Sequence, residues 1–314
     1  MSSADAAATL RPEVRRTGLA PRFRSSVERA IHVFLFACAG ISVLTTVSIV
    51  VVLLVESVRF FFDVSVVDFL TDTKWTPLLK PQHFGILPLM CGTLLVAFGS
   101  SLIAIPVGLG TAIFLSEYAS SRCRDVVKPV VEVLAGIPSV VYGYFAVVSI
   151  SPLVRSVFPS AGPFNAASAC VVVGIMTLPM IISLSEDALR AVPRSLREGS
   201  YALGATKFNT TVQVVVPAAM SGIVASFLLA ISRAIGETMA VTLAAGATPK
   251  ATLNPLESVQ TMTAYIVQIS QGDTPAGTVE YRTIFAVGLA LFLSTMLINL
   301  LAQWILSNMR EKYE

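Results

Sequence analysis

Two opposite charges four residues apart, Arg233 and Glu237, lie inside the long apolar stretch AISRAIGETMAVTLAAG. A charge at the centre of a membrane span costs about 2.5–3.5 kcal/mol on insertion scales, so it is seldom kept without a use. On a continuous helix the two side chains share a face and can pair. One interpretation is a structural ion pair between helices. The other is that Arg233 faces a translocation route and meets an anion, while Glu237 sets its position and balances its charge.

Small residues continue the face of this pair at spacings of three and four, and they are Gly222, Ser226, Ala230, Ala240 and Ala244. A stripe of small residues packs against another helix or lines a protein interior, so lipid is expected on the opposite side. A guanidinium suits a tetrahedral oxyanion, because its planar fork donates two parallel hydrogen bonds. The pattern favours an anionic solute without identifying it.

A second polar stretch, residues 195–217, separates two apolar segments. Ser195 and Glu198 have the spacing of a capping box, which predicts a helix start. Gly204 is placed to end that helix, because glycine accepts the left-handed backbone after a last turn. Pro217 then begins the next apolar segment, where its missing N–H costs little. A short helix between two apolar segments predicts a contact with something outside the membrane.

The composition of the chain is typical of a membrane protein. The 314 residues are 54% apolar and 13% charged, whereas a soluble domain carries about 25% charged residues. Each apolar run can cross the ~30 Å apolar layer, which takes about 20 helical residues. The sequence therefore predicts an all-α membrane protein with six spans, at about residues 31–55, 85–115, 129–150, 167–184, 218–247 and 284–306.

Lysine and arginine predict the orientation. Most of the 22 basic residues fall on the side that holds the N-terminus, which is the cytoplasmic side by the positive-inside rule. Both termini and the stretch 195–217 are then cytoplasmic. Residues 1–30 are interpreted as a basic, flexible cytoplasmic tail, too long and polar to begin a cleaved signal peptide. Residues 31–314 are expected to form the transmembrane domain.

Several other functions find no support in the residues. The four cysteines form no CxxC pair, so no zinc site or disulfide framework is indicated. No Gly-rich loop with Lys-Ser/Thr is present, so the chain is not expected to hydrolyse ATP itself. The net charge of +3 is too small to imply nucleic acid. Glu186 and Asp187, beside Arg190, are interpreted as solvated charges at the inner end of the fourth span.

The polar stretch has a specific spacing. EGSYALG, then nine residues, then VVVP resembles the EAA loop of ABC-importer permeases, which reads Glu-Ala-Ala, three residues, Gly, nine residues, Ile-x-Leu-Pro. Gly199 and Ser200 replace two alanines, and valines replace the Ile and Leu. These are exchanges of small for small or aliphatic for aliphatic residues, so the helix and its packing are still expected.

Four stretches are similar to the permeases of the high-affinity phosphate importer. They are SEYASS (116–121), AGIPSVVYGYF (135–145), ALGATKF (202–208) and SRAIGETMAVTLAAG (232–246). The last resembles the C-type subunits (PstC) more than their A-type partners. The resemblance covers nearly everything after residue 30, and the stretches stand in the expected order.

This resemblance implies a type I ABC-importer permease, a MetI-like bundle of six transmembrane helices in the bacterial plasma (inner) membrane. It implies a PstA-like second permease, a PstB-like cytoplasmic ATPase dimer and a PstS-like outer phosphate-binding protein. Phosphate is the implied substrate, and ATP and Mg are used by the ATPase. The chain itself is expected to be no enzyme and to bind no cofactor, metal or nucleic acid.

The resemblance also implies that a loop at about residues 186–217 carries a coupling helix seated in a groove of the ATPase. The coupling residues it implies are Leu196, Glu198, Gly199, Ser200, Ala202, Gly204 and Ala205. The spans are expected to rock by bending at Gly136, Pro138, Pro179 and Pro217. Through Pro217 the loop leads straight to Arg233, a rigid link of about 24 Å if it is one helix.

Other readings of the same residues remain open. The loop motif fits importers of sulfate, molybdate or phosphonate equally well, and the span motifs favour phosphate. An ion-coupled transporter or channel would use Arg233 and Glu237 as a proton relay, but it leaves the capped loop helix unexplained. A membrane-embedded enzyme lacks an assembled catalytic group.

Overall fold

The computed structural model describes residues 21–309, so residues 1–20 of the predicted tail and residues 310–314 lie outside the described range. The chain divides into two units, Met1–Val52 and Leu53–Glu314. The described part of the first unit belongs entirely to α1 (Pro21–Asp63), which begins within the predicted tail. Most apolar side chains of α1 between Ile31 and Val52 are exposed, as expected for a helix surrounded by lipid.

Among the described residues, five helices are long and apolar enough to cross a membrane. They become six if the bent pair Lys207–Ala218 and Met220–Gly236 forms one span. The same residues contain no strand, only an isolated bridge between Trp75 and Phe84. The predicted all-α class is therefore confirmed, and the predicted six spans are reached only if the bent pair crosses the membrane as one.

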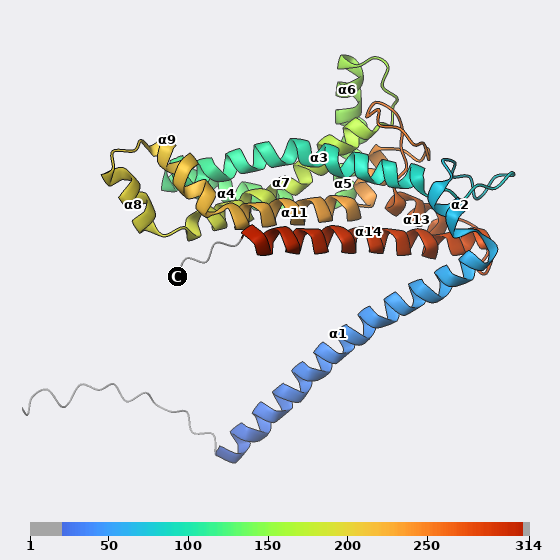
Figure 1. Cartoon of the computed structure of the whole chain (residues 1–314), viewed down its shortest axis with the longest axis horizontal. Helices are drawn as coiled ribbons and strands as arrows, with labels where there is room; N and C mark the ends of the chain where they lie inside the picture. The colour runs from blue at the N-terminus through green and yellow to red at the C-terminus, as the bar shows by residue number, and fades with distance from the viewer. Residues whose placement is uncertain (1–20, 310–314) are drawn as a thin grey trace, which may run out of the picture. The chain divides into compact units, whose positions relative to one another are not determined.

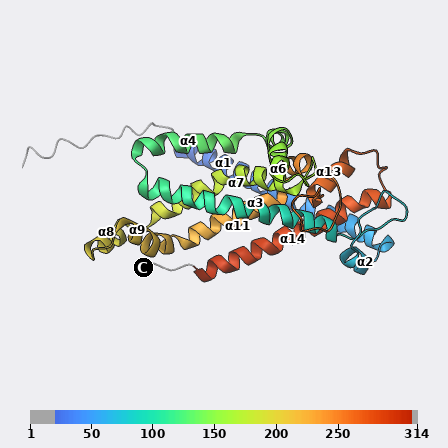
Figure 2. The same cartoon turned by 90° about the horizontal axis from the view of Figure 1, so that it is seen from above.

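Four long helices of the second unit run side by side, as both views show (Figures 1 and 2). They are α3 (Leu87–Ile113), α7 (Ala166–Ala191), α11 (Met220–Gly236) and α14 (Val279–Met309). Glycines let α3 and α7 approach closely. A Cβ at Gly99 would lie 2.5 Å from Cys170 Sγ, and one at Gly108 would lie 2.7 Å from Ile181. These two helices consequently pack as a tight pair.

The third predicted span, 129–150, is wrong at both ends. The chain forms α4 (Ser121–Gly136), then α5 (Ser139–Phe145), the π-helical turn η2 (Ala146–Ile150) and α6 (Ser151–Val157). Between α4 and α5, Ile137 and Pro138 are extended, with ψ of 128° and 138°. Proline disfavours a helical residue before it and has no N–H to donate, so the helix stops there.

The fifth predicted span, 218–247, is not one helix. After α11 ends at Gly236, Glu237 is extended with ψ of 133°, and a short α12 (Met239–Ala244) follows. Before α11, η3 (Thr211–Val215) and α10 (Val216–Ala218) meet it at a bend of 68°. Pro217 lies in α10, directly before this bend. The predicted straight link from Pro217 to Arg233 is therefore wrong.

The end of the bundle farthest from α8 is held by aromatic rings. Phe60, Phe69, Trp75, Phe84 and Tyr265 pack edge to face around α2 (Val66–Thr71). His83 Nδ1 lies 2.9 Å from a carboxylate oxygen of Asp72, and this hydrogen bond lowers the pKa of Asp72.

The segment between the fifth and sixth predicted spans, residues 248–283, contains α13 (Met262–Gln271). Residues 259–265 are buried, so this segment packs into the bundle rather than simply connecting two spans. Thr261 caps α13 by accepting a hydrogen bond from the Ala264 N–H, and Thr93 of α3 accepts one from the Met262 N–H. These buried polar contacts explain why a polar sequence can enter the core.

Candidate functional site

The opposite end of the bundle carries α8 (Arg194–Ala202) and α9 (Lys207–Thr210) (Figure 1). The predicted capping box at Ser195 is wrong. Pro193 is the N-cap, with ψ of 138°, and no side chain caps the helix. Because α8 starts at Arg194, Ser195 already lies in its first turn and cannot act as the cap.

The predicted end of α8 at Gly204 is confirmed. Gly204 has φ of +84°, in the left-handed region. Its N–H donates to the Tyr201 carbonyl at 2.9 Å, and the Ala205 N–H donates to the Ser200 carbonyl at 3.2 Å. This is the pair of bonds of a Schellman motif. The Ser200 hydroxyl also lies 2.9 Å from the Thr210 hydroxyl, so a side-chain hydrogen bond ties α8 to α9.

One side of α8 faces the bundle and the other is exposed. Leu196 packs against a buried cluster that includes Ala112 of α3 and Leu189 of α7. Glu198, Gly199 and Ala202 are exposed, and Leu203 is 91% exposed. A Cβ at Gly199 would meet no atom within 4 Å. α8 thus presents the small residues Gly199 and Ala202 on an uncovered face, and Leu203 is exposed directly after its end.

Arg197, which sequence reasoning overlooked, holds α8 against the bundle. Its guanidinium donates to the carbonyls of Val192 at 2.6 Å and Leu189 at 2.8 Å. It also donates to Glu117 Oε1 at 3.1 Å, and the two side chains are 17% and 8% exposed. Glu117 belongs to η1 (Phe114–Tyr118), the π-helical turn that extends α3. These two residues are 80 positions apart in the chain, and no local spacing in the sequence predicts their contact.

The prediction that Glu186 is solvated is wrong. Its residue exposure is 0%, and three cations lie around its carboxylate. Lys128 is at 3.3 Å, and Arg124 and Arg190 are each at 3.5 Å. Arg124 and Lys128 reach it because α4 packs along α7 (Figure 2). The carboxylate therefore balances charge between two helices rather than facing water at a helix end.

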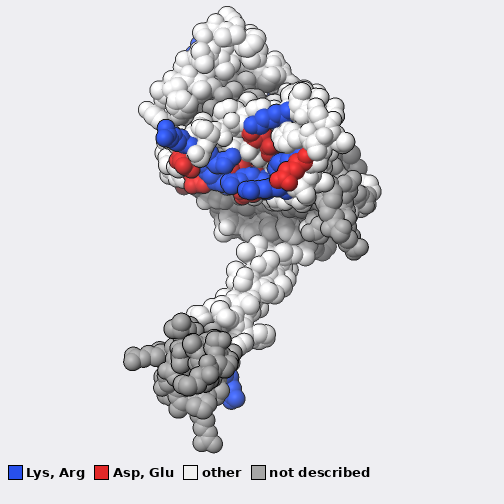
Figure 3. All heavy atoms as spheres, turned by 90° about the vertical axis from the view of Figure 1, so that its left-hand side faces the viewer, with Lys and Arg blue, Asp and Glu red and all other residues white. Residues whose placement is uncertain are grey.

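Lys, Arg, Asp and Glu side chains intermingle on this end of the bundle, as Figure 3 shows. Their centre is a pocket of about 460 Å³, with Glu117, Arg124, Arg190, Arg194 and Arg197 among its lining residues. Arg124 also donates to the Leu115 carbonyl at 2.5 and 3.1 Å and to the Ser116 carbonyl at 3.3 Å. Arginines from α4 and α8 therefore both bind η1, Arg124 through the Leu115 and Ser116 carbonyls and Arg197 through Glu117.

Arg233 and Glu237 do not form the predicted pair. Because α11 ends at Gly236, they do not share a helical face, and no ion pair joins them in the described structure. Glu237 Oε1 instead accepts from the Ala240 N–H at 3.2 Å, and the Glu237 carbonyl accepts from the Thr263 hydroxyl at 2.8 Å. Arg233 is exposed and has no hydrogen-bond or ionic partner within residues 21–309.

The predicted stripe of small residues does pack against a neighbouring helix. Ser226 lies 2.8 Å from Ser185 of α7, measured between hydroxyl oxygens, and Ala230 is buried. A Cβ at Gly222 would collide with Ala188 of α7. The stripe therefore joins α11 to α7, and Arg233 projects beyond that contact.

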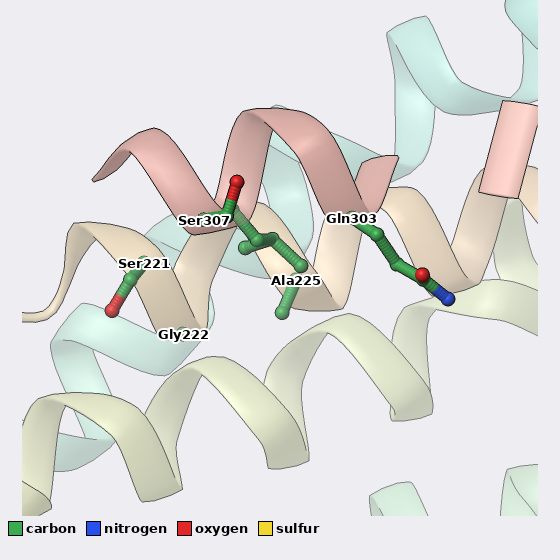
Figure 4. A pocket seen from close by; sticks show the side chains of 6 residues that line it. Ser221, Gly222, Ala225, Gln303 and Ser307 are labelled. Carbon is green, nitrogen blue, oxygen red and sulfur yellow. The ribbon is translucent and has the colours of Figure 1, made fainter. Parts of the chain in front are cut away.

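Space remains on two sides of the first turn of α11. A pocket of about 410 Å³ lies between α11 and α14, lined by Ser221, Gly222 and Ala225 opposite Gln303 and Ser307 (Figure 4). A second pocket of about 250 Å³ also borders Ser221 and Gly222 and reaches Pro193. The two pockets therefore flank Ser221 and Gly222, while Ala219 at the bend is buried.

The four residues expected to bend helices occupy different settings. Gly136 ends α4 and Pro138 caps α5, on either side of the break. Pro179 lies inside the continuous helix α7, and Pro217 precedes the 68° bend. Their use as hinges during transport stays a prediction.

Residues 104–312 match the family model described as binding-protein-dependent transport system inner membrane component. The chain is 37% identical over 273 residues to the probable ABC transporter permease protein YqgH of Bacillus subtilis, covering 86% of this chain and 88% of that one. It is 34% identical over 257 residues to the phosphate transport system permease protein PstC of Mesorhizobium japonicum, covering 76% and 77%. It is 39% identical over 177 residues to the phosphate transport system permease protein PstA 1 of Mycobacterium tuberculosis, covering 55% and 56%.

Solved transporters share the fold. A permease chain of a bacterial alginate ABC transporter, in complex with an alginate pentasaccharide-bound periplasmic protein, superposes with a TM-score of 0.61 at 16% identity. That match covers 90% of this chain and 96% of the other. A chain of the inward-facing MetNI methionine ABC transporter gives 0.58 at 18% identity and covers 74% and 100%. The helical arrangement is thus that of MetI-like permeases.

Proposed function

This chain belongs to the family of inner-membrane components of binding-protein-dependent transport systems, the type I ABC-importer permeases, and we propose that it imports inorganic phosphate. As a multi-pass membrane subunit it forms half of the pathway, and a PstA-like second permease supplies the other half. A PstS-like protein delivers phosphate from outside, and a PstB-like ATPase dimer drives the cycle with ATP and Mg. The chain itself hydrolyses no ATP and binds no cofactor.

Arg233 is the observation that carries this proposal. It is exposed in the last turn of an apolar helix and lacks a partner in the described part of the chain. A guanidinium facing lipid at that depth is costly, so this face of α11 is expected to adjoin a second protein surface or a water-filled route. A phosphate in that route accepts two parallel hydrogen bonds from the guanidinium. The curated relatives named as phosphate permeases supply the identity of the anion.

Glu237 has a different role from the one its spacing suggests. Its side chain caps α12 and its carbonyl accepts a hydrogen bond from Thr263 of α13. Glu237 therefore stabilises the extended backbone between α11 and α12, beside Arg233. Extended backbone within a span is tolerated where protein or a water-filled cavity surrounds it. We infer that the break from Gly236 to Thr238 borders the phosphate route and that Glu237 keeps its geometry.

The uncovered face of α8 is the proposed ATPase contact. Gly199 and Ala202 leave room for close approach, Glu198 offers a polar contact, and Leu203 offers an apolar one. The Schellman bonds of Gly204 and Ala205 and the Ser200–Thr210 hydrogen bond hold this face in place, while Leu196 anchors it to the bundle. We propose that the α8 end is cytoplasmic, as the positive-inside rule predicts for both termini, with the chain in the bacterial inner membrane.

The test is ATP-dependent phosphate uptake by proteoliposomes that contain both permeases, the ATPase and the binding protein. Arg233→Ala is expected to lower uptake by roughly 10–100-fold, because hydrogen bonds to a charged group contribute about 1.5–3 kcal/mol each. Arg233→Lys keeps the charge but loses the planar fork, so its uptake is expected to lie between the two. Arg155→Ala removes an exposed arginine at the end of α6 and serves as the matched control.

Two results would contradict the proposal separately. Unchanged uptake by Arg233→Ala would remove Arg233 from the phosphate route. Uptake of sulfate, molybdate or a phosphonate in place of phosphate, measured by competition in the same vesicles, would assign another oxyanion to the importer.

A further inference from the structure

We propose that Arg197 is a positioning residue for energy coupling. It locks α8 to the ends of α7 and α3, so that a movement of α8 is passed to the α3–α7 pair through this contact. This inference rests on the proposed function, because it takes the ATPase as the source of the movement. It goes beyond that function by naming the path through which the movement enters the bundle.

The contacts of Arg197 cross the corner between α7 and α8. The guanidinium lies on α8, and it binds the carbonyls of Leu189 and Val192 at the end of α7. These carbonyls have no partner within their own helix, and a cation there is favourable to the helix dipole. The turn at Pro193 is therefore stabilised by the side chain of Arg197 as well as by the backbone.

The third contact of Arg197 extends this stabilisation to α3. Glu117 ends η1, and its carboxylate meets the same guanidinium at 3.1 Å with both groups largely buried. On the far side of η1, Arg124 binds the carbonyls of Leu115 and Ser116 and approaches Glu186 of α7 at 3.5 Å. The ends of α3, α4, α7 and α8 are thus joined by charge-assisted hydrogen bonds, which are stronger than neutral ones.

A second path runs along the chain from α8 to α11. It passes through α9, η3 and α10 and then turns by 68° at Ala219. The first turn of α11 next to this bend has a pocket on each of two sides. Gly99 and Gly108 leave no room for a Cβ between α3 and α7, and Gly222 leaves none between α11 and α7, so all three helices pack closely. A displacement of α8 enters the α3–α7 pair directly through the contacts of Arg197, whereas along the chain it must pass the bend at Ala219.

The experiment compares phosphate uptake with ATP hydrolysis in the reconstituted four-component importer. Arg197→Met keeps a long side chain and removes the donors. Uptake per ATP hydrolysed is expected to fall by about tenfold, a usual size for coupling between two sites, while ATP hydrolysis continues. A role in folding alone would lower assembly, hydrolysis and uptake together and leave their ratio unchanged.

Two variants and one control keep the result interpretable. Arg197→Lys retains the positive charge but lacks the planar guanidinium. Its uptake per ATP hydrolysed is expected to lie between that of Arg197→Met and that of the unaltered importer. Glu117→Gln leaves the two carbonyl bonds intact, and its ratio is expected to fall by less than that of Arg197→Met. Arg122→Met removes an exposed arginine of α4 for which no partner occurs in the described part of the chain, and its ratio should match the unaltered importer. If Arg197→Met does not assemble, Glu117→Gln decides: an unchanged ratio overturns the proposal.

A second readout does not depend on the transported solute. In the assembled complex, amide hydrogen exchange in residues 189–197 is expected to accelerate in Arg197→Met, while exchange in residues 220–226 changes little. If the amides of residues 189–197 exchange equally slowly in the variant and the unaltered protein, Arg197 does not stabilise this turn and the proposal is wrong. This result does not depend on whether phosphate is the substrate. Failure of the unaltered importer to take up phosphate would instead contradict only the proposed function.

Discussion

The two joints that connect α8 to the bundle are built differently. The upstream joint, Val192 and Pro193, is crossed by the side chain of Arg197, which binds the end of α7 and Glu117. The downstream joint, at Ala219, turns by 68° beside two pockets. The upstream joint is held by charge-assisted contacts between segments distant in sequence, and the downstream joint is held by apolar packing of Val215, Ala219 and Ile223.

This difference shows that continuity of the chain is a poor guide to mechanical connection. Pro217 and Arg233 belong to one covalent segment, yet the bend at Ala219 lies between them. Arg197 and Glu117 are far apart in sequence, yet their buried contact joins α8 to α3. Packed side chains and ionic networks carry coupling between sites, so the upstream joint is the better candidate for transmission.

The largest expected effect is on the upstream side, at Glu186. Glu186→Gln leaves Arg124 and Lys128 without their buried counter-charge, so the complex is expected to lose about 3 kcal/mol of stability. Denaturant unfolding of the purified complex measures this loss. Asp187→Asn is the matched control, because that side chain is 63% exposed and its pair with Lys128 should contribute less than about 1 kcal/mol. Equal losses in the two variants would mean that Glu186 is not a buried counter-charge.

A smaller effect is expected at the downstream joint. In Gly222→Ala the new methyl group meets Ala188, so α11 must shift away from α7 at a cost of about 2 kcal/mol. Gly236→Ala is the control, because a Cβ there meets no atom within 4 Å. The same unfolding measurement applies. A Gly222→Ala complex as stable as the control would show that the pockets beside Gly222 let the joint relax freely.

The smallest expected effect is within α8 itself. Gly204→Ala places a side chain at φ of +84°, which costs about 1 kcal/mol and weakens the bonds that end the helix. The amides of residues 204 and 205 should then exchange faster with solvent. Gly199→Ala, in the open interior of α8, should slow exchange, because alanine favours helix over glycine by about 1 kcal/mol. Acceleration in both variants would indicate that α8 is held only by its contacts with the bundle.

Local patterns predicted much of the fold. The apolar runs predicted a six-span all-α protein, and the described helices agree in class and reach six spans if the bent pair is one span. Gly204 predicted the end of α8, and the spacing of Gly222, Ser226 and Ala230 predicted a packed face. Each of these depends on residues within a few turns of one another, which the linear sequence displays directly.

The errors arose where a local pattern allowed two outcomes. Pro138 predicts a bend within one span, whereas Ile137 and Pro138 separate two helices. Arg233 and Glu237 have the spacing of a helical pair, but the helix ends at Gly236 and Glu237 caps α12 instead. The contact of Glu237 with Thr263, 26 residues away, helps to hold the break, and no periodicity within the span reveals it.

By itself the sequence determined the membrane-spanning helical class, the resemblance to ABC-importer permeases and the helix that projects from the bundle. Hydrophobic runs, turn residues and motif spacing are local properties, and they survive without knowledge of the fold. Only the tertiary structure decided that Glu186 is buried, that Arg197 contacts Glu117, and that Arg233 is not paired with Glu237. The reason is that burial and charge pairing depend on which distant helices pack together, and α4 must lie along α7 before Lys128 can reach Glu186.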